Sequence, residues 1–128
     1  MRSLAVIAVL FLAVLAGACG LLPEVKDETV GWSANKLYSE AKENMVYGGY
    51  ETAIKYFEKL ESRYPYGSFA QQAQIEIAYA YWKNNDIPSA IAACERFIKL
   101  HPNHPNVDYV FYLRGLININ EDLGLMGI

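Results

Sequence analysis

Two stretches of the sequence, YETAIKYFEKLESRYP (residues 50–65) and IPSAIAACERFIKLHP (residues 87–102), align without a gap. Each has an Ala-Ile pair at its fourth and fifth positions, a glutamate at its ninth and a proline at its end. The offset between them is 37 residues, and Ala41 and Ala78 keep this offset in the segments that precede them. Internal repetition with such a period is typical of solenoids built from helix pairs.

Within each unit, the spacing of small and large residues matches a tetratricopeptide repeat of about 34 residues followed by a short connector. Small residues let paired helices approach closely, and larger ones fill the space beside them. The matching residues are Leu37, Ala41, Ala53, Phe57, Leu60 and Pro65, then Ile77, Ala78, Tyr81, Ala90, Cys94, Phe97 and Pro102. The spacing predicts an all-α fold, a tetratricopeptide-like solenoid of helical hairpins with two complete repeats and the start of a third.

Three local signals indicate where the helices begin and where the chain turns. Ser68, with Gln71 three residues later, predicts a capping box. Asp86 can cap the helix that contains Pro88, since proline is tolerated in a first turn. The pair Gly48-Gly49 predicts the turn inside the first repeat.

A third unit begins at Asp108, with Phe111 and Gly115 at the positions of the core residues of the first helix. Its second helix does not follow, because residues 117–128 contain two glycines and no amphipathic pattern. An unpaired repeat helix leaves an apolar face in water. We therefore expect either that the chain is a fragment of a longer protein or that its third helix needs a partner.

The N-terminal segment is apolar from Leu4 to Ala18 and follows a single positive charge at Arg2. A helix of this length spans roughly 22 Å, whereas a bilayer core is about 30 Å thick, so the segment is too short to cross a membrane. A core helix would have a polar face, and this segment has none. The basic start, apolar middle and small residues at the exit predict a secretory signal peptide over residues 1–18.

The stretch LAGACG (residues 15–20) resembles the lipobox of bacterial lipoproteins. The resemblance implies that Cys19 is the first mature residue and is acylated, and two or more acyl chains give stable anchoring. Gly20, where aspartate would favour inner-membrane retention, implies the periplasmic face of the outer membrane of a Gram-negative cell. Residues 19–33 would then be a lipidated N-terminus and tether, ahead of a repeat domain over residues 34–128. The alternative is a cysteine that merely happens to follow a cleavage site.

Composition excludes several classes of function. The net charge of −3 argues against nucleic-acid binding and against electrostatic attraction to anionic lipid. With Cys19 acylated, Cys94 has no disulfide partner and is expected to be a small buried hydrophobe. His101 and His104 have no third metal ligand near them in sequence, which leaves a metal-dependent hydrolase without support. Since no catalytic arrangement or phosphate-binding loop is present either, we expect no enzyme, no cofactor and no metal.

The first helix of each repeat is expected to line a concave groove. In other repeats of this kind, positions 2, 5, 9 and 12 point into it. Here these are Asn35, Tyr38, Lys42 and Met45, then Gln72, Ile75, Tyr79 and Trp82, then Tyr109, Tyr112, Leu116 and Ile119. Aromatic side chains give a large contact area at low entropic cost, which suits an extended peptide with apolar side chains. The candidate peptide-binding residues are Tyr38, Tyr79, Trp82, Tyr109 and Tyr112; alternatively, these rings pack in the core.

Three stretches carry a family resemblance: RYPYG (63–67), AYAYWKNNDIPSA (78–90) and RFIKLHPNHPNVDYVFYLRGL (96–116). They resemble the tetratricopeptide-repeat lipoproteins of the β-barrel assembly machinery of the outer membrane. The resemblance implies a non-enzymatic periplasmic scaffold whose partners are the other subunits of that machinery and unfolded outer-membrane proteins. In that family the first repeats receive the substrate's C-terminal strand, which ends in an aromatic residue.

The same resemblance implies that Tyr64 and Gly67, in the loop that closes the first unit, contact the substrate. The alternative interpretation of RYPYG is a turn with no binding role. An alternative for the whole chain is a tetratricopeptide lipoprotein of pilus assembly or envelope division.

Overall fold

The computed structural model describes residues 26–125, with side chains as far as Asn120. The helices in this range are α2 (Ala34–Val46), α3 (Tyr50–Arg63), α4 (Ser68–Lys83), α5 (Ile87–Leu100) and α6 (Val107–Leu125), and this part of the chain has no strand. None of these helices is both long enough and apolar enough to span a bilayer. The predicted signal peptide and Cys19 lie outside the described residues.

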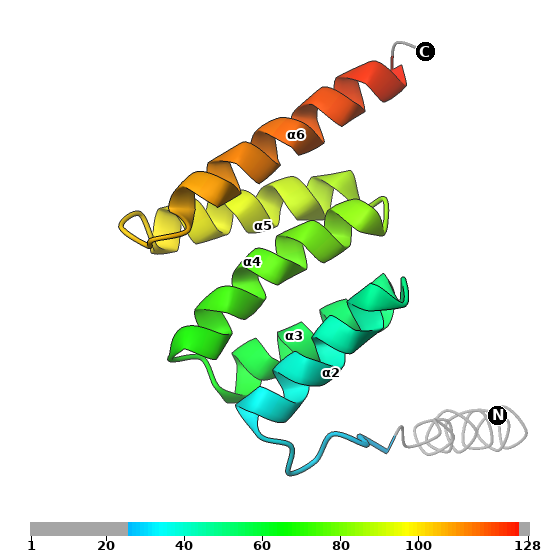
Figure 1. Cartoon of the computed structure of the whole chain (residues 1–128), viewed down its shortest axis with the longest axis vertical. Coiled ribbons are helices and arrows are strands. Elements are labelled where there is room, and N and C mark those ends of the chain that lie inside the picture. The colour runs from blue at the N-terminus through cyan, green and yellow to red at the C-terminus, as the bar shows by residue number, and fades with distance from the viewer. Residues whose placement is uncertain (1–25, 126–128) are drawn as a thin grey trace, which may run out of the picture. The chain divides into compact units, whose positions relative to one another are not determined.

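The helices form hairpins that stack in chain order (Figure 1). Each helix packs against the next one, so α2 pairs with α3 and α4 with α5, while α4 rests on α3 and α6 on α5. The first helices also touch directly, α2 with α4 and α4 with α6. This arrangement confirms the predicted all-α, tetratricopeptide-like solenoid.

The core includes most of the residues that the repeat spacing selected, although Pro65 and Pro102 are exposed. Ala41, Ala53 and Ala90 have no exposed surface, and neither have the rings of Phe57 and Phe97. Fully burying a large apolar side chain stabilises a fold by about 1.5–3 kcal/mol. The alanines permit the close approach that brings these rings into contact with neighbouring helices. Cys94 is also completely buried, as expected of a small hydrophobe.

Two of the three local sequence signals are confirmed. A carboxylate oxygen of Asp86 accepts a hydrogen bond of 3.2 Å from the Ser89 amide, and Pro88 lies in the first turn of α5. Gly48 adopts a positive φ of 77°, and the following glycine is the N-cap of α3. This is the turn predicted for the glycine pair, and it reverses the chain between α2 and α3.

The predicted capping box at the start of α4 is wrong. Ser68 is the first helical residue rather than the N-cap, and no side chain caps this end. The N-cap is Gly67, whose φ of 108° and ψ of 176° are readily accessible to glycine but strained for residues with a Cβ. Its carbonyl accepts the first helical bond, from the amide of Gln71. Because α4 already begins at Ser68, this serine cannot be the N-cap residue that precedes the helix.

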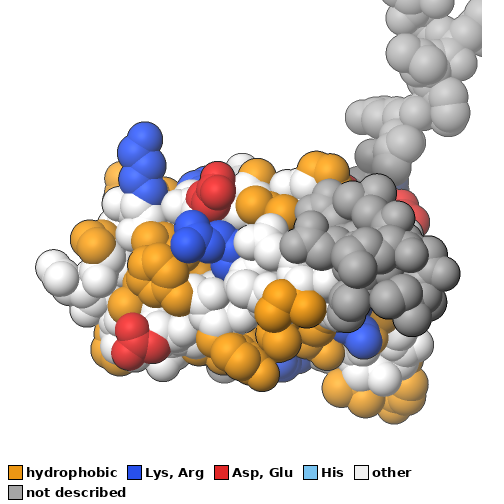
Figure 2. Space-filling model, turned by 90° about the horizontal axis from the view of Figure 1, so that it is seen from above, with side chains coloured by type: hydrophobic (Ala, Val, Ile, Leu, Met, Phe, Trp, Pro, Cys, Tyr) orange, Lys and Arg blue, Asp and Glu red, His pale blue; other side chains and the backbone are white. Residues whose placement is uncertain are grey.

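The third unit begins with α6, one face of which packs on the preceding hairpin. Val110, Leu113 and Ile117 are buried against the preceding hairpin, because α6 packs on α5. Phe111, predicted at a core position, is 46% exposed instead. The corresponding residue of the first unit, Leu37, is fully buried in the α2–α3 hairpin. Figure 2 views the α6 end and shows hydrophobic side chains exposed there between charged ones.

Candidate functional site

A hollow of about 580 Å³ lies along the first helices of the hairpins. Its lining comes from α2, α4 and α6 and from the loop before α6. The residues are Lys42, Met45, Gln72, Ile75, Glu76, Tyr79, Asn106 and Tyr109. Six of these eight stand at the positions predicted to face a groove, and we call this hollow the groove. The arrangement of first helices along one surface thus follows the expectation from the repeat spacing.

The polar centre of the groove is Glu76, a residue that no sequence motif singled out. Its Oε1 accepts hydrogen bonds from the Tyr38 hydroxyl at 3.3 Å, from Lys42 Nζ at 3.0 Å and from Gln72 Nε2 at 3.3 Å. The side chain of Glu76 is only 15% exposed. The available signal was a single acid within the otherwise uncharged stretch from Ser68 to Trp82. An isolated charge inside an apolar helix needs a partner, and here Lys42 of the neighbouring repeat supplies it.

The carboxylate of Glu76 affects the tyrosines around it. Burial, followed by the negative charge and hydrogen bond of Glu76, raises the pKa of Tyr38 to about 12. Burial and the same charge also raise the pKa of Tyr109. Both hydroxyls therefore keep their protons to a higher pH than an ordinary tyrosine does.

The five predicted aromatic residues lie in different surroundings. Tyr79 and Tyr109 line the groove. Tyr38 packs against Phe57, with ring centroids 5.7 Å apart, and reaches the groove through its hydroxyl. Trp82 packs edge-to-face against Tyr79 at 5.9 Å and also touches the core.

Tyr112 is 63% exposed and does not line the groove. The two sequence interpretations, groove and core, are thus not exclusive, since a ring such as Tyr79 serves both.

Tyr64 and Gly67 frame the loop between α3 and α4. The Tyr64 hydroxyl donates a hydrogen bond of 2.8 Å to the carbonyl oxygen of Trp32, which ties the segment before α2 to the end of α3. Gly67 supplies the backbone conformation at which α4 starts. Neither residue lines the groove. Tyr66 between them is 92% exposed and available to a partner.

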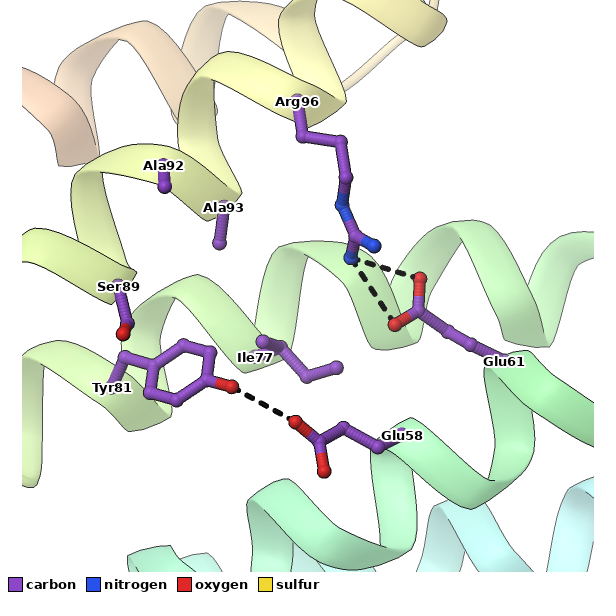
Figure 3. Close-up of a pocket in the computed structure, with 8 residues that line it drawn as sticks. All are labelled: Glu58, Glu61, Ile77, Tyr81, Ser89, Ala92, Ala93 and Arg96. Carbon is purple, nitrogen blue, oxygen red and sulfur yellow. Dashed lines mark hydrogen bonds and ion pairs between the residues drawn. The ribbon is translucent and has the colours of Figure 1, made fainter.

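A second, smaller hollow of about 280 Å³ lies between α3, α4 and α5. Figure 3 shows that two cross-helix contacts flank it: the Tyr81 hydroxyl donates to Glu58 Oε1 at 2.9 Å, and Arg96 binds Glu61. Arg96 Nη2 lies 3.1 and 3.2 Å from the two carboxylate oxygens. Because these charges are already paired, the hollow is better explained as a gap between two linked hairpins than as a second binding site.

The two histidines pack around one core ring. His101 and His104 lie 5.0 and 5.2 Å from Phe97, measured between ring centroids. His101 Nε2 hydrogen-bonds to Gln74 Oε1 at 2.9 Å, and His104 Nδ1 accepts from the amide of Asn106 at 3.1 Å. Among the described residues, no group of three or more His, Cys, Asp or Glu side chains could hold a metal ion. The pair therefore orders the loop that leads into α6.

Comparison with known families agrees with this architecture. A family model described as "YfiO: Outer membrane lipoprotein" matches residues 31–127. The chain belongs to the YfiO family of outer membrane lipoproteins. This family assignment covers all the described helices and the groove between them.

Curated relatives of this YfiO-family chain include proteins named outer membrane protein assembly factor BamD. The protein of that name from Neisseria meningitidis serogroup B is 50% identical over 94 residues, which cover 73% of this chain and 35% of the relative. The one from Vibrio cholerae is 39% identical over 117 residues, covering 91% of this chain and 47% of the relative. The chain thus spans less than half the length of these relatives.

Proposed function

We propose that this chain acts in outer-membrane protein assembly as a lipid-anchored periplasmic scaffold. It binds extended segments of unfolded outer-membrane proteins and works together with other subunits of the β-barrel assembly machinery. The proposal requires binding only and assigns no catalytic step to the chain. Its main support is the groove lined by the first helices, in a family whose curated members are named assembly factors.

The chemistry of the groove suits an unfolded β-strand. Met45, Tyr79 and Tyr109 offer apolar surface, while Lys42 and Glu76 offer polar contacts beside it. An extended strand presents side chains alternately to opposite sides, so apolar side chains can enter the groove while the others face solvent. A C-terminal strand ending in an aromatic residue fits this pattern, because its last ring can pack on Tyr79 or Tyr109.

Anchoring is proposed to come from acyl chains on Cys19. The family is described as outer membrane lipoproteins, and residues 15–20 resemble a lipobox that ends at this cysteine. Two or more acyl chains hold a protein stably on a membrane, whereas one gives only reversible binding. Mass spectrometry of the mature N-terminus tests this point: an unacylated Cys19 would contradict it.

The alternative of a pilus-assembly or division lipoprotein is not favoured. The curated relatives from several bacteria share one name, and that name refers to outer-membrane protein assembly. A pulldown from solubilised envelopes with the full-length, lipidated protein distinguishes the two functions. Failure to recover a large outer-membrane barrel subunit would favour the alternative.

A direct test measures peptide binding by fluorescence anisotropy, using the lipidated chain in detergent. The probe is a labelled peptide of alternating polar and apolar residues that ends in phenylalanine. We expect Tyr79→Ala to weaken binding about tenfold with unchanged helicity. Tyr47→Ala is the matched control, because Tyr47 is 81% exposed and does not line the groove. Equal affinities for all three proteins would contradict the proposed role of the groove.

A further inference from the structure

The ion pair at the centre of the groove has unused hydrogen-bonding capacity on both sides. An ammonium group has three N–H donors, and Glu76 engages one of those of Lys42. All three contacts to Glu76 meet at Oε1, so Oε2 accepts no hydrogen bond within the described part of the chain. The groove therefore offers free N–H donors and a free carboxylate oxygen at the same place.

The partner that matches this pattern is a polypeptide backbone. In an extended segment, each residue has one N–H donor and one C=O acceptor, and both need partners when they leave water. Neighbouring N–H and C=O groups on one edge of the segment can face a donor and an acceptor that lie side by side. The pair adds no net charge, so it does not select a charged side chain.

We propose that Lys42 and Glu76 form a main-chain anchor for the segment held in the groove. Lys42 donates to a backbone carbonyl oxygen, and Glu76 Oε2 accepts a backbone N–H. The contacts from Tyr38 and Gln72 to Oε1 hold the carboxylate in place. This inference rests on the proposed function. It explains how a single groove can bind unfolded segments of many different sequences.

The anchor also predicts that folded proteins do not bind in the groove. In a folded β-barrel, backbone N–H and C=O groups are paired with neighbouring strands and cannot reach Lys42 or Glu76. Only an unpaired strand has both groups free. Selection by backbone availability therefore separates unfolded from folded substrates without reading a sequence.

The experiment compares the labelled peptide described above with versions N-methylated at one backbone amide each. N-methylation removes a single donor. With the unmodified protein, we expect one or two positions at which the methyl group lowers affinity about tenfold, while other positions change it less than twofold. Equal affinities for the parent peptide and every methylated version would overturn the inference.

A double variant, Lys42→Met with Glu76→Met, removes the anchor without leaving an unpaired charge. We expect it to bind the parent peptide about tenfold more weakly and to lose all sensitivity to N-methylation. Lys55→Met with Glu51→Met is the matched control, because that pair, 2.9 Å apart on α3, is exposed and lies outside the groove. Glu76→Gln keeps an acceptor oxygen and should retain the sensitivity.

Two further outcomes separate the inference from the function on which it rests. If the unmodified protein does not bind the parent peptide at all, the proposed function fails. If it binds a free-acid peptide but not its C-terminal amide, and the double variant abolishes this difference, Lys42 binds the terminal carboxylate and the main-chain anchor is wrong. If the double variant does not fold, the N-methylation series on the unmodified protein still tests the main-chain anchor.

Discussion

The hydroxyl of Tyr81 on α4 donates a hydrogen bond of 2.9 Å to the carboxylate of Glu58 on α3. The two residues are 23 positions apart in sequence and belong to different repeats. Burial, followed by the hydrogen bond and negative charge of Glu58, raises the pKa of Tyr81 to about 12. The contact thus favours the protonated tyrosine in the folded chain and links the first hairpin to the second.

This linkage predicts that the protein loses stability at alkaline pH. A tyrosine has a pKa near 10 when unfolded, so a folded pKa of about 12 stabilises the fold fully below pH 10. That contribution is lost as the pH rises from 10 toward 12. We expect Tyr81→Phe to reduce the free energy of unfolding at pH 7 by about 0.5 kcal/mol, because the contact is partly exposed.

Urea unfolding followed by circular dichroism at pH 7, 9 and 11 measures this effect. Tyr81→Phe should show a smaller loss of stability between pH 9 and 11 than the unmodified protein. Tyr66→Phe serves as the control, since Tyr66 is 92% exposed. An identical alkaline loss in all three proteins would exclude a role for Tyr81.

Gly67 provides a second prediction, since its backbone conformation rather than its surroundings requires glycine. A Cβ at this position would meet no atom within 4 Å, yet the φ of 108° lies in a region that other residues rarely adopt. We expect Gly67→Ala to lower the free energy of unfolding by about 1–3 kcal/mol. The measurement is chemical unfolding at pH 7.

Gly115→Ala is the matched control for Gly67→Ala. Gly115 lies inside α6, has ordinary helical φ and also leaves open space for a Cβ. Alanine is favoured over glycine in a helix by about 1 kcal/mol, so this variant should be slightly stabilised. If both variants lose the same stability, backbone strain at Gly67 is not the cause.

Much of the fold could be predicted because the repeat spacing reports directly on packing. Ala53 and Ala90, or Leu60 and Phe97, occupy equivalent buried positions, and a residue packed between two neighbouring helices leaves a strong sequence pattern. The groove positions were also predictable in outline, because they follow from the same helical register. Phe111 was predicted as a core residue, and it is exposed because no described helix covers that face of α6.

The details of the candidate site were harder to predict because they depend on contacts between repeats. Glu76 gains its role from Lys42, which is 34 residues away, and nothing near Glu76 in sequence indicates that partner. The helix start at Gly67 depends on a backbone angle, and the local sequence favoured a serine cap instead. Pairwise polar geometry across helices carries no periodicity, so pattern analysis does not detect it.

The close approach of the helices predicts a strong difference between two alanines on α5. Ala90 has no exposed surface, whereas Ala92 is exposed and borders the small hollow between α3, α4 and α5. We expect Ala90→Leu to cost about 1–3 kcal/mol through overpacking. Ala92→Leu should change stability by less than about 0.5 kcal/mol. If chemical unfolding shows comparable losses of stability in the two variants, the spacing between helices does not restrict the size of the side chain at position 90.

The two cysteines give a final prediction that joins the fold to the proposed anchor. Burial raises the pKa of the Cys94 thiol to about 11, and the nearby Arg114 offsets this only in part. Since the thiolate is the reactive form and Cys94 is fully buried, a disulfide reagent at pH 8 should find no reactive thiol in the folded, lipidated protein. In denaturant it should find one per chain, because acylation occupies Cys19. A chain expressed without the signal peptide, in which Cys19 carries no acyl group, should instead show two reactive thiols in denaturant. A fast-reacting thiol in the lipidated, folded protein would contradict either the acylation of Cys19 or the burial of Cys94, and mass mapping of the labelled residue would show which.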